Sequence, residues 1–247
     1  FDSQSATSTL LLELALAGVQ NAIAILPATG RFNVTIVSDM ISSDFETQFR
    51  ESWEKTYPGY AITGSVSCCE TLSFAWVEER LKNPVFDIDL ILILQHQGSK
   101  HYSDALATII VTSDDVVEKH NLCHSSRILR PMPLCMPNFK ADIGLFLETQ
   151  TIACQTSKVF CDYGHWNNCF ADLMTASQSH MTPWVPQEID VLEKYNGIPG
   201  AGSAWLLAIL LADIVSVSNE PVLGMFTSGK DRFVSTVIPG SENNDAG

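Results

Sequence analysis

Two carboxylates stand close together in the segment FDIDLILILQHQG, residues 86–98, and their spacing could serve metal or phosphate chemistry. Asp87 and Asp89 are separated by one residue, and paired carboxylates can hold a divalent cation or attack a phosphorus atom. An unbroken apolar run follows them, which is typical of a strand that is buried on both faces of a parallel sheet. The run therefore places both aspartates at the amino end of this strand, away from the edge where ligands bind.

The other end of the same strand carries polar residues that could bind a ligand. Gln95, His96 and Gln97 follow the apolar run, and their side chains can donate and accept hydrogen bonds. A solvated loop is the alternative interpretation. Similar polar groups end the three other predicted strands, among them Ser65 and Ser67 at the end of the second. The ends of the first, third and fourth strands predict a ligand-binding site formed by Ser38, Asp39, Gln95, His96, Gln97 and Asp114.

A second group of reactive residues lies in CDYGHWNNC, residues 161–169. It contains Asp162, His165 and Trp166. Histidine and tryptophan rings together can form a stacking wall with polar partners, and we add Trp166 to the ligand-binding candidates. A loop closed by a disulfide between Cys161 and Cys169 is the alternative, and the two interpretations are compatible.

Nucleophile motifs are poor in this chain. There is no G-x-S-x-G; the nearest segment is GSVSC at 64–68, with Cys68 in place of the last glycine. Its Ser65 could form a catalytic triad with Asp162 and His165, and His180 is a second choice for the base. The segment GAGS at 200–203 could offer backbone N–H groups to an anion, or it could simply begin a helix.

A metal site has little support. His120 and His124 are four residues apart with Cys123 between them, a spacing that can hold zinc on one helical face. No second pair of ligands stands at a recognisable distance. We therefore predict no metal and no cofactor.

The elements that would position these residues alternate between strand and helix from residue 32 onwards. Right-handed crossovers place helices on both faces of such a sheet, and the carboxyl ends of its strands share one edge. The fold class predicted is α/β, with a mainly parallel sheet, two lobes as one option, and a β-hairpin near the C-terminus at 221–238. The expected strands are 32–40, 61–67, 87–95 and 108–115, and the expected helices between them are 42–57 and 70–84.

The chain is expected to divide into an N-terminal helix packed on the body, a Rossmann-like half, a second half or lobe, and a frayed tail. The apolar stretch 204–217 is read as a core helix, because a bilayer span needs about 20 residues. The four segments are 1–31, 32–126, 127–240 and 241–247.

Composition limits the partners. Of the 247 residues, 46% are hydrophobic and 17% charged, and the formal charge is −14. Such an acidic surface without basic patches repels nucleic acid and anionic membranes, so we predict neither nucleic-acid binding nor membrane insertion. The presence of seven cysteines favours disulfides and a secreted or extracytoplasmic location. The sequence does not predict an oligomeric state.

Two resemblances to known families extend this reading. VFDIDLIL resembles the D-x-D motif of haloacid-dehalogenase-type phosphatases, which would give Ser113, Lys158 and Asp162 supporting roles. In that family, however, the aspartates follow the hydrophobic strand rather than precede it.

The segment 32–115 resembles the first lobe of type I periplasmic-binding-protein-like domains. The matching text is NVTIVSDMISSDFETQF, GYAITGSVS, FAWVEERLKNPVFDIDLILIL and TIIVTSDD. This resemblance implies that the protein binds a small polar molecule in a cleft at the carboxyl ends of the strands. The alternative is a hydrolase on the same sheet, either of the esterase type with Ser65, Asp162 and His165 or of the phosphatase type.

Overall fold

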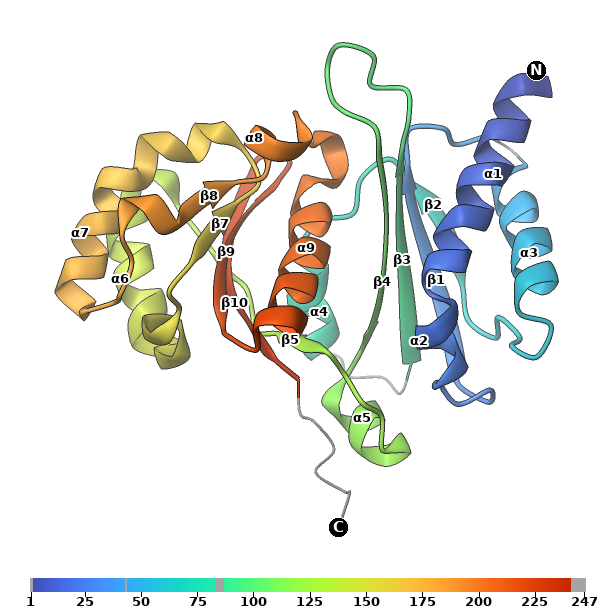
Figure 1. The fold of residues 1–247 in the computed structure, drawn as a ribbon, viewed down its shortest axis with the longest axis horizontal. Helices are drawn as coiled ribbons and strands as arrows, with labels where there is room; N and C mark the ends of the chain where they lie inside the picture. Colours follow the sequence, from blue (N-terminus) through green and yellow to red (C-terminus); the bar gives the residue numbers. More distant parts are fainter. Residues whose placement is uncertain (1, 43, 83–86, 241–247) are drawn as a thin grey trace. The chain divides into compact units, whose positions relative to one another are not determined.

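A computed structural model describes residues 2–42, 44–82 and 87–240, and within it the chain forms two compact units (Figure 1). Unit 1 contains Phe1–Leu72 and Asn83–Leu122, and unit 2 contains Ser73–Lys82 and Cys123–Gly247. The predicted α/β class with helices on both faces and a C-terminal hairpin is confirmed, with two mixed sheets in place of one mainly parallel sheet.

Unit 1 is built on a sheet with the strand order β2-β1-β3-β4. Strand β1 runs parallel to β2 and β3, whereas β4 runs antiparallel to β3. Its elements are α1 (Asp2–Gly18), α2 (Gln20–Ala24), β1 (Arg31–Ser38), α3 (Phe45–Thr56), β2 (Val66–Cys69), β3 (Asp87–Gln95), β4 (Ala105–Thr112) and α5 (Asp114–His120).

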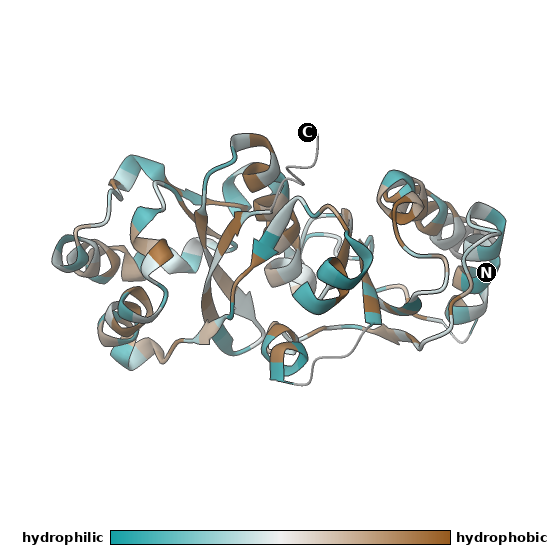
Figure 2. Cartoon of the chain, turned by 90° about the horizontal axis from the view of Figure 1, so that it is seen from below, coloured by the Kyte–Doolittle hydropathy of each residue, from teal (hydrophilic) through white to brown (hydrophobic). Residues whose placement is uncertain are grey.

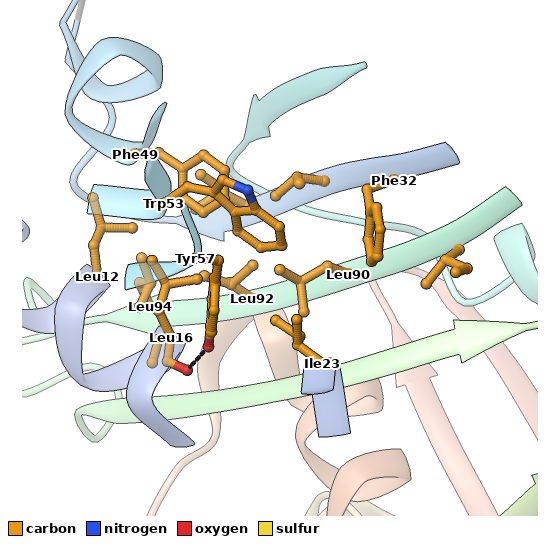
Figure 3. Close-up of a cluster of buried hydrophobic side chains, with 14 of the residues drawn as sticks. Leu12, Leu16, Ile23, Phe32, Phe49, Trp53, Tyr57, Leu90, Leu92 and Leu94 are labelled. Carbon is orange, nitrogen blue, oxygen red and sulfur yellow. Dashed lines mark hydrogen bonds between the residues drawn. The ribbon is translucent and has the colours of Figure 1, made fainter. Parts of the chain in front are cut away.

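The core of unit 1 forms where helices α1 and α3 pack on one face of this sheet (Figure 3). Alternate residues of β1 and β3 point into it, as the two-residue period of a strand requires. Trp53 of α3 and Tyr57, which directly follows α3, fill the space between helix and sheet, and the Tyr57 hydroxyl donates to the Leu16 carbonyl oxygen. Burial raises the pKa of Tyr57 to about 12. Each fully buried large side chain of this kind contributes about 1.5–3 kcal/mol.

Unit 2 is built on a sheet with the strand order β5-β10-β9-β7-β8, with β6 paired to β10. Strand β7 runs parallel to β8 and β9, and β9 and β10 form the predicted C-terminal hairpin. Its elements are α4 (Trp76–Lys82), β5 (Ser126–Ile128), β6 (Met132–Pro133), α6 (Phe139–Thr149), β7 (Val159–Cys161), α7 (Phe170–His180), β8 (Ile189–Val191), α8 (Glu193–Asn196), α9 (Ser203–Ser218), β9 (Val222–Ser228) and β10 (Asp231–Pro239).

Helices cover both faces of the unit 2 sheet. Leu223 and Met225 of β9 pack in one cluster with residues of α6 and α7. On the other face, α9 lies on β9 and β10. Phe74, just before α4, stacks on Phe226 with 4.2 Å between the ring centroids. In Figure 2 the helices carry both hydrophobic and hydrophilic residues, as expected of helices with one buried face.

Helix α9 is the apolar stretch that the sequence identifies. Among the described residues, Gly200–Ser218 has the length and composition to cross a membrane, and 44% of that window is buried within the structure. Leu207, Leu211 and Val215 are fully buried, and α9 packs on β9 within unit 2. We therefore interpret α9 as a core helix.

The two units repeat one topology, although the sequence contains no visible repeat. In unit 1 the order β2-β1-β3-β4 combines parallel, parallel and antiparallel pairs. In unit 2 the order β8-β7-β9-β10 combines the same three pairs. In each unit the next strand along the chain, β4 or β10, therefore pairs antiparallel with the third of the parallel strands, β3 or β9.

Candidate functional site

An open pocket of about 300 Å³ lies in unit 2 at the carboxyl ends of parallel strands and at the start of helix α9. Polar side chains from different parts of the chain meet there, at the edge where ligands bind in sheets of this kind. The residues that line it are Tyr163, His165, Gly200, Ala201, Ser203, Thr227 and Gly229.

Asp162 lies immediately after β7, next to the lining residues Tyr163 and Thr227, and its side chain is completely buried. Its Oδ1 atom accepts hydrogen bonds from the Tyr163 backbone N–H and the Trp166 indole N–H, both at 2.9 Å. Its Oδ2 atom accepts from the Thr227 backbone N–H at 2.6 Å, and the Thr227 hydroxyl is 2.8 Å from Oδ1. Burial raises the pKa of Asp162, and the donors from Thr227 and Trp166 oppose that shift.

His165 is a titratable residue that lines the pocket. Its side chain is exposed, and its Nε2 atom lies 3.3 Å from the Thr227 hydroxyl oxygen. The ring stacks against Tyr163 and Trp166. Desolvation by these neighbours, followed by the positive charge of Arg232, lowers the pKa of His165 below its ordinary 6.5. The imidazole is therefore neutral at pH 7 and can accept a proton.

Hydroxyl groups and a helix amino terminus complete the lining. The Tyr163 hydroxyl donates to the Gly200 carbonyl oxygen at 2.7 Å, and the Ser203 hydroxyl donates to the Thr227 carbonyl oxygen at 2.8 Å. Both hydroxyl oxygens keep acceptor capacity. Gly200 has a φ of 67°, a left-handed conformation that glycine adopts readily, and it turns the chain into α9. The amino end of a helix favours negative charge.

Asp162 has a structural counterpart in unit 1. Asp39 follows β1 as Asp162 follows β7, and its carboxylate accepts the N–H groups of His96 and Gln97 at the end of β3. The pairing register is the same in both units, since Ser38 pairs with Leu94 and Cys161 pairs with Met225. An aspartate after the first strand that accepts hydrogen bonds from the end of the third strand is therefore part of the repeated topology.

The structure brings together most of the ligand-binding residues that were predicted in unit 1. Asp39 accepts from the backbone at positions 96 and 97 and from the Tyr102 hydroxyl at 2.9 Å, and His96 Nδ1 lies 3.0 Å from the Asp104 carboxylate. Ser38 and Gln95 are buried. These polar groups are largely occupied by one another.

Asp114 lies elsewhere, and the expectation that it shares this edge is wrong. Strand β4 is antiparallel, so its end at Thr112 pairs with Ile88 at the beginning of β3. Asp114 therefore lies at the opposite edge of the sheet, where it begins helix α5.

Ser65 and the two aspartates of the D-x-D segment also belong to the amino edge of the unit 1 sheet. Strand β2 begins at Val66, so Ser65 precedes the strand and does not end it. Its N–H donates to the Asn33 side-chain oxygen at 3.0 Å. The Asn33 amide donates to Asp87 at 2.9 Å and to Asp89 at 3.3 Å. These contacts give the D-x-D pair a structural role at the strand entrance.

The sequence singled out Asp162, His165, Trp166 and the GAGS segment, and the structure places them all in or beside the pocket of unit 2. Sequence reasoning missed Thr227 and Tyr163. Thr227 lies near the end of a predicted hairpin strand, and its residue type does not distinguish it from the other polar residues of that hairpin. Pairing of that strand with the one before Asp162 would have been the signal.

The cysteines are free thiols in the structure. The predicted disulfide between Cys161 and Cys169 is therefore wrong, and the predicted secreted location loses its support. Cys68 and Cys69 end strand β2 and are half-buried. Burial raises the pKa of both thiols; Glu46 adds to the shift at Cys68, whereas the Thr71 backbone N–H opposes it at Cys69.

The sequence matches no family model and no curated protein. Solved structures with a thiolase-like fold do match. A type II PKS ketosynthase in complex with its acyl-carrier protein is 9% identical, with a TM-score of 0.57 over 87% of this chain and 77% of that chain. Peroxisomal 3-ketoacyl-CoA thiolase of Saccharomyces cerevisiae is 11% identical, with a TM-score of 0.55 over 94% and 90%. Human mitochondrial 3-ketoacyl-CoA thiolase is also 11% identical, with a TM-score of 0.55 over 95% and 93%.

At these identities the likeness establishes the fold: the chain has a thiolase-like α/β fold. The yeast thiolase is described as two core domains of identical topology, and the two units here repeat one topology as well. The resemblance to type I periplasmic-binding proteins and the Rossmann-like assignment are therefore wrong. The functions built on them, a polar-ligand binder or a hydrolase, fall with them, because the structures that share this fold are thiolases and condensing enzymes.

Proposed function

We propose that the protein transfers acyl groups that are carried as thioesters, and that the pocket of unit 2 binds the thioester end. The observation that carries the proposal is a neutral imidazole beside hydroxyl oxygens and the start of α9, in a chain with the thiolase-like fold. The names of the similar structures include CoA thioesters and an acyl-carrier protein.

The chemistry of acyl transfer fits the groups in the pocket. A thiol must lose its proton, its sulfur must bond to the carbonyl carbon, and the original C–S bond must break while the leaving sulfur regains a proton. His165 is placed to hold that proton, and a positioned base of this kind contributes about 10²–10⁴-fold in rate. The negative charge that develops on the carbonyl oxygen is stabilised by N–H groups at a helix amino terminus.

The expected partner is a carrier with a thioester-linked acyl group, either coenzyme A or an acyl-carrier protein. The pocket of about 300 Å³ lies at the lower end of the range for small-molecule sites. We therefore expect a short acyl group rather than a long chain. This partner replaces the small polar molecule that the sequence predicted.

Of the two half-buried cysteines that end β2, we expect Cys69 to hold an acyl group more readily than Cys68. The thiolate is the reactive form of a cysteine. The Thr71 N–H stabilises the thiolate of Cys69, whereas Glu46 destabilises that of Cys68. The two cysteines are neighbours with similar burial, so each is a matched control for the other.

The proposal is tested by acyl exchange. Acetyl-CoA is incubated with the protein and isotopically labelled free CoA, and label entering acetyl-CoA is followed by mass spectrometry. We expect exchange by the wild-type protein, and acetylation of the intact protein that is lost in Cys69→Ser and kept in Cys68→Ser. Acetylation that persists in Cys69→Ser and disappears in Cys68→Ser would contradict the assignment. Absence of exchange with both acetyl-CoA and an acetylated carrier protein would contradict the function.

A further inference from the structure

The environment of Asp162 determines which way the hydrogen bonds in this part of unit 2 run. Three backbone or indole N–H groups, from Tyr163, Trp166 and Thr227, point at its two oxygens. These N–H groups can only donate, and donors of this kind favour the ionised carboxylate. A carboxylate can only accept hydrogen bonds.

The direction of the next hydrogen bond follows from this. Because Asp162 only accepts, the Thr227 hydroxyl, 2.8 Å from Asp162 Oδ1, donates its proton to the carboxylate. The hydroxyl oxygen then keeps only its lone pairs for other neighbours. His165 Nε2, 3.3 Å away, must therefore carry a proton and donate it to Thr227.

The other ring nitrogen of His165 is left as the acceptor. Within the part of the chain that the structure describes, no hydrogen bond to Nδ1 is formed, and the side chain is exposed. The charged groups that act on the ring are Arg232, Asp162 and Glu193. A neutral imidazole with its proton on Nε2 has its basic lone pair on Nδ1.

We propose that Thr227 and Asp162 are positioning residues that hold His165 in the tautomer with its proton on Nε2, so that Nδ1 is the basic nitrogen of the pocket. The catalytic meaning of this arrangement rests on the proposed acyl transfer. The tautomer itself can be observed without any activity.

The tautomer is measured on the intact protein with ¹⁵N-labelled histidine, from two-bond ¹H–¹⁵N correlations at a pH where His165 is neutral. We expect one tautomer for His165, with the proton on Nε2. His96 is the internal reference for the opposite tautomer, because its Nδ1 lies 3.0 Å from the Asp104 carboxylate and must donate to it.

Two variants separate positioning from packing. Thr227→Val keeps the branched shape but removes the hydroxyl, and we expect His165 to change to a mixture of tautomers. Thr227→Ser keeps the hydroxyl, and we expect it to restore the single tautomer. A wild-type signal with the proton on Nδ1, or an unchanged tautomer in Thr227→Val, would overturn the proposal.

Activity gives a second and independent readout. If the protein exchanges acyl groups, Thr227→Val should lower kcat by about tenfold with little change in KM, and Thr227→Ser should restore kcat. Equal kcat in wild type and Thr227→Val would overturn the positioning role. Failure of exchange in the wild type, with the single tautomer still observed, would remove the proposed function and leave the tautomer assignment standing.

Discussion

At the scale of residues, each unit has an aspartate at the same strand-end position, and the surroundings of the two aspartates differ. Asp39 and Asp162 occupy equivalent places in the repeated topology, and each accepts N–H groups from the end of the third strand. Asp162 alone is followed by a histidine and a tryptophan that pack beside it. The contact between this aspartate and the third strand is therefore a feature of the fold, and the four residues after Asp162 distinguish the candidate site in unit 2.

The pKa of His165 should respond to its two charged neighbours in opposite directions. Arg232 lowers this pKa and Glu193 raises it. We expect an NMR titration midpoint below 6.5 in the wild type, a higher midpoint in Arg232→Met and a lower one in Glu193→Gln. Because a lowered histidine pKa means that the unfolded chain binds more protons, the stability from this group is complete above pH 6.5. It is lost as the pH falls through the folded pKa.

The contrary result for this prediction is a wild-type midpoint at or above 6.5 that Arg232→Met does not move. Such a result would mean that His165 is charged at mildly acidic pH. His165 would then be a poorer base in the pocket than the proposed acyl transfer requires.

Part of the site was predictable at this scale. Asp162, His165 and Trp166 are close in sequence and of reactive types, so the segment CDYGHWNNC could be singled out without a structure. Thr227 is 65 residues from Asp162, and only strand pairing brings the two together. A single sequence contains no signal for that pairing.

At the scale of elements, the close packing of α9 on β9 depends on one glycine. A Cβ atom at Gly224 would lie 2.3 Å from the Phe226 ring and 2.7 Å from the Leu211 side chain. Both distances are shorter than any ordinary contact, so the Phe226 ring and the Leu211 side chain would have to shift from their packed positions. Extra volume in a packed core costs about 1–3 kcal/mol.

Gly224→Ala should therefore lower the free energy of unfolding by about 1–3 kcal/mol, measured by urea denaturation. Gly59→Ala is the matched control, because a Cβ there meets no atom within 4 Å, and we expect it to be near neutral. Equal stability of the two variants would show that α9 does not pack on β9 as closely as described.

The elements show where a sequence-based prediction works and where it stops. The apolar runs of β1 and β3 were recognised within a residue or two, because burial leaves a strong pattern. The direction of β4 was not recognised. The connection from Gln95 to Ala105 is too short to hold a crossover helix, and a parallel crossover needs about a dozen residues or more. That length was the signal for an antiparallel hairpin.

At the scale of the whole molecule, the repeat of topology lies in strand order and not in sequence. Strand β1 has eight residues, and its counterpart β7 has three, so no alignment of side chains marks the repeat. The segment Ser73–Lys82 belongs to unit 2 although it lies between two parts of unit 1 in the chain. Domain borders read along a sequence cannot show such an exchange of segments.

The free thiols give a prediction for the whole chain. Denaturation without reductant, followed by thiol titration with Ellman's reagent, should yield seven thiols per chain, because none of the seven cysteines forms a disulfide in the structure. A count of five would mean that one disulfide forms. Peptide mapping would then show whether it joins Cys161 and Cys169.

In the proposed acyl transfer from thioesters, His165 is the base. This role is tested by the rate of label exchange between acetyl-CoA and free CoA in the wild type and in His165→Asn, with His101→Asn as a control in unit 1. We expect a fall of about 10²–10⁴-fold in His165→Asn and an unchanged rate in His101→Asn. Exchange at the wild-type rate in His165→Asn would contradict it.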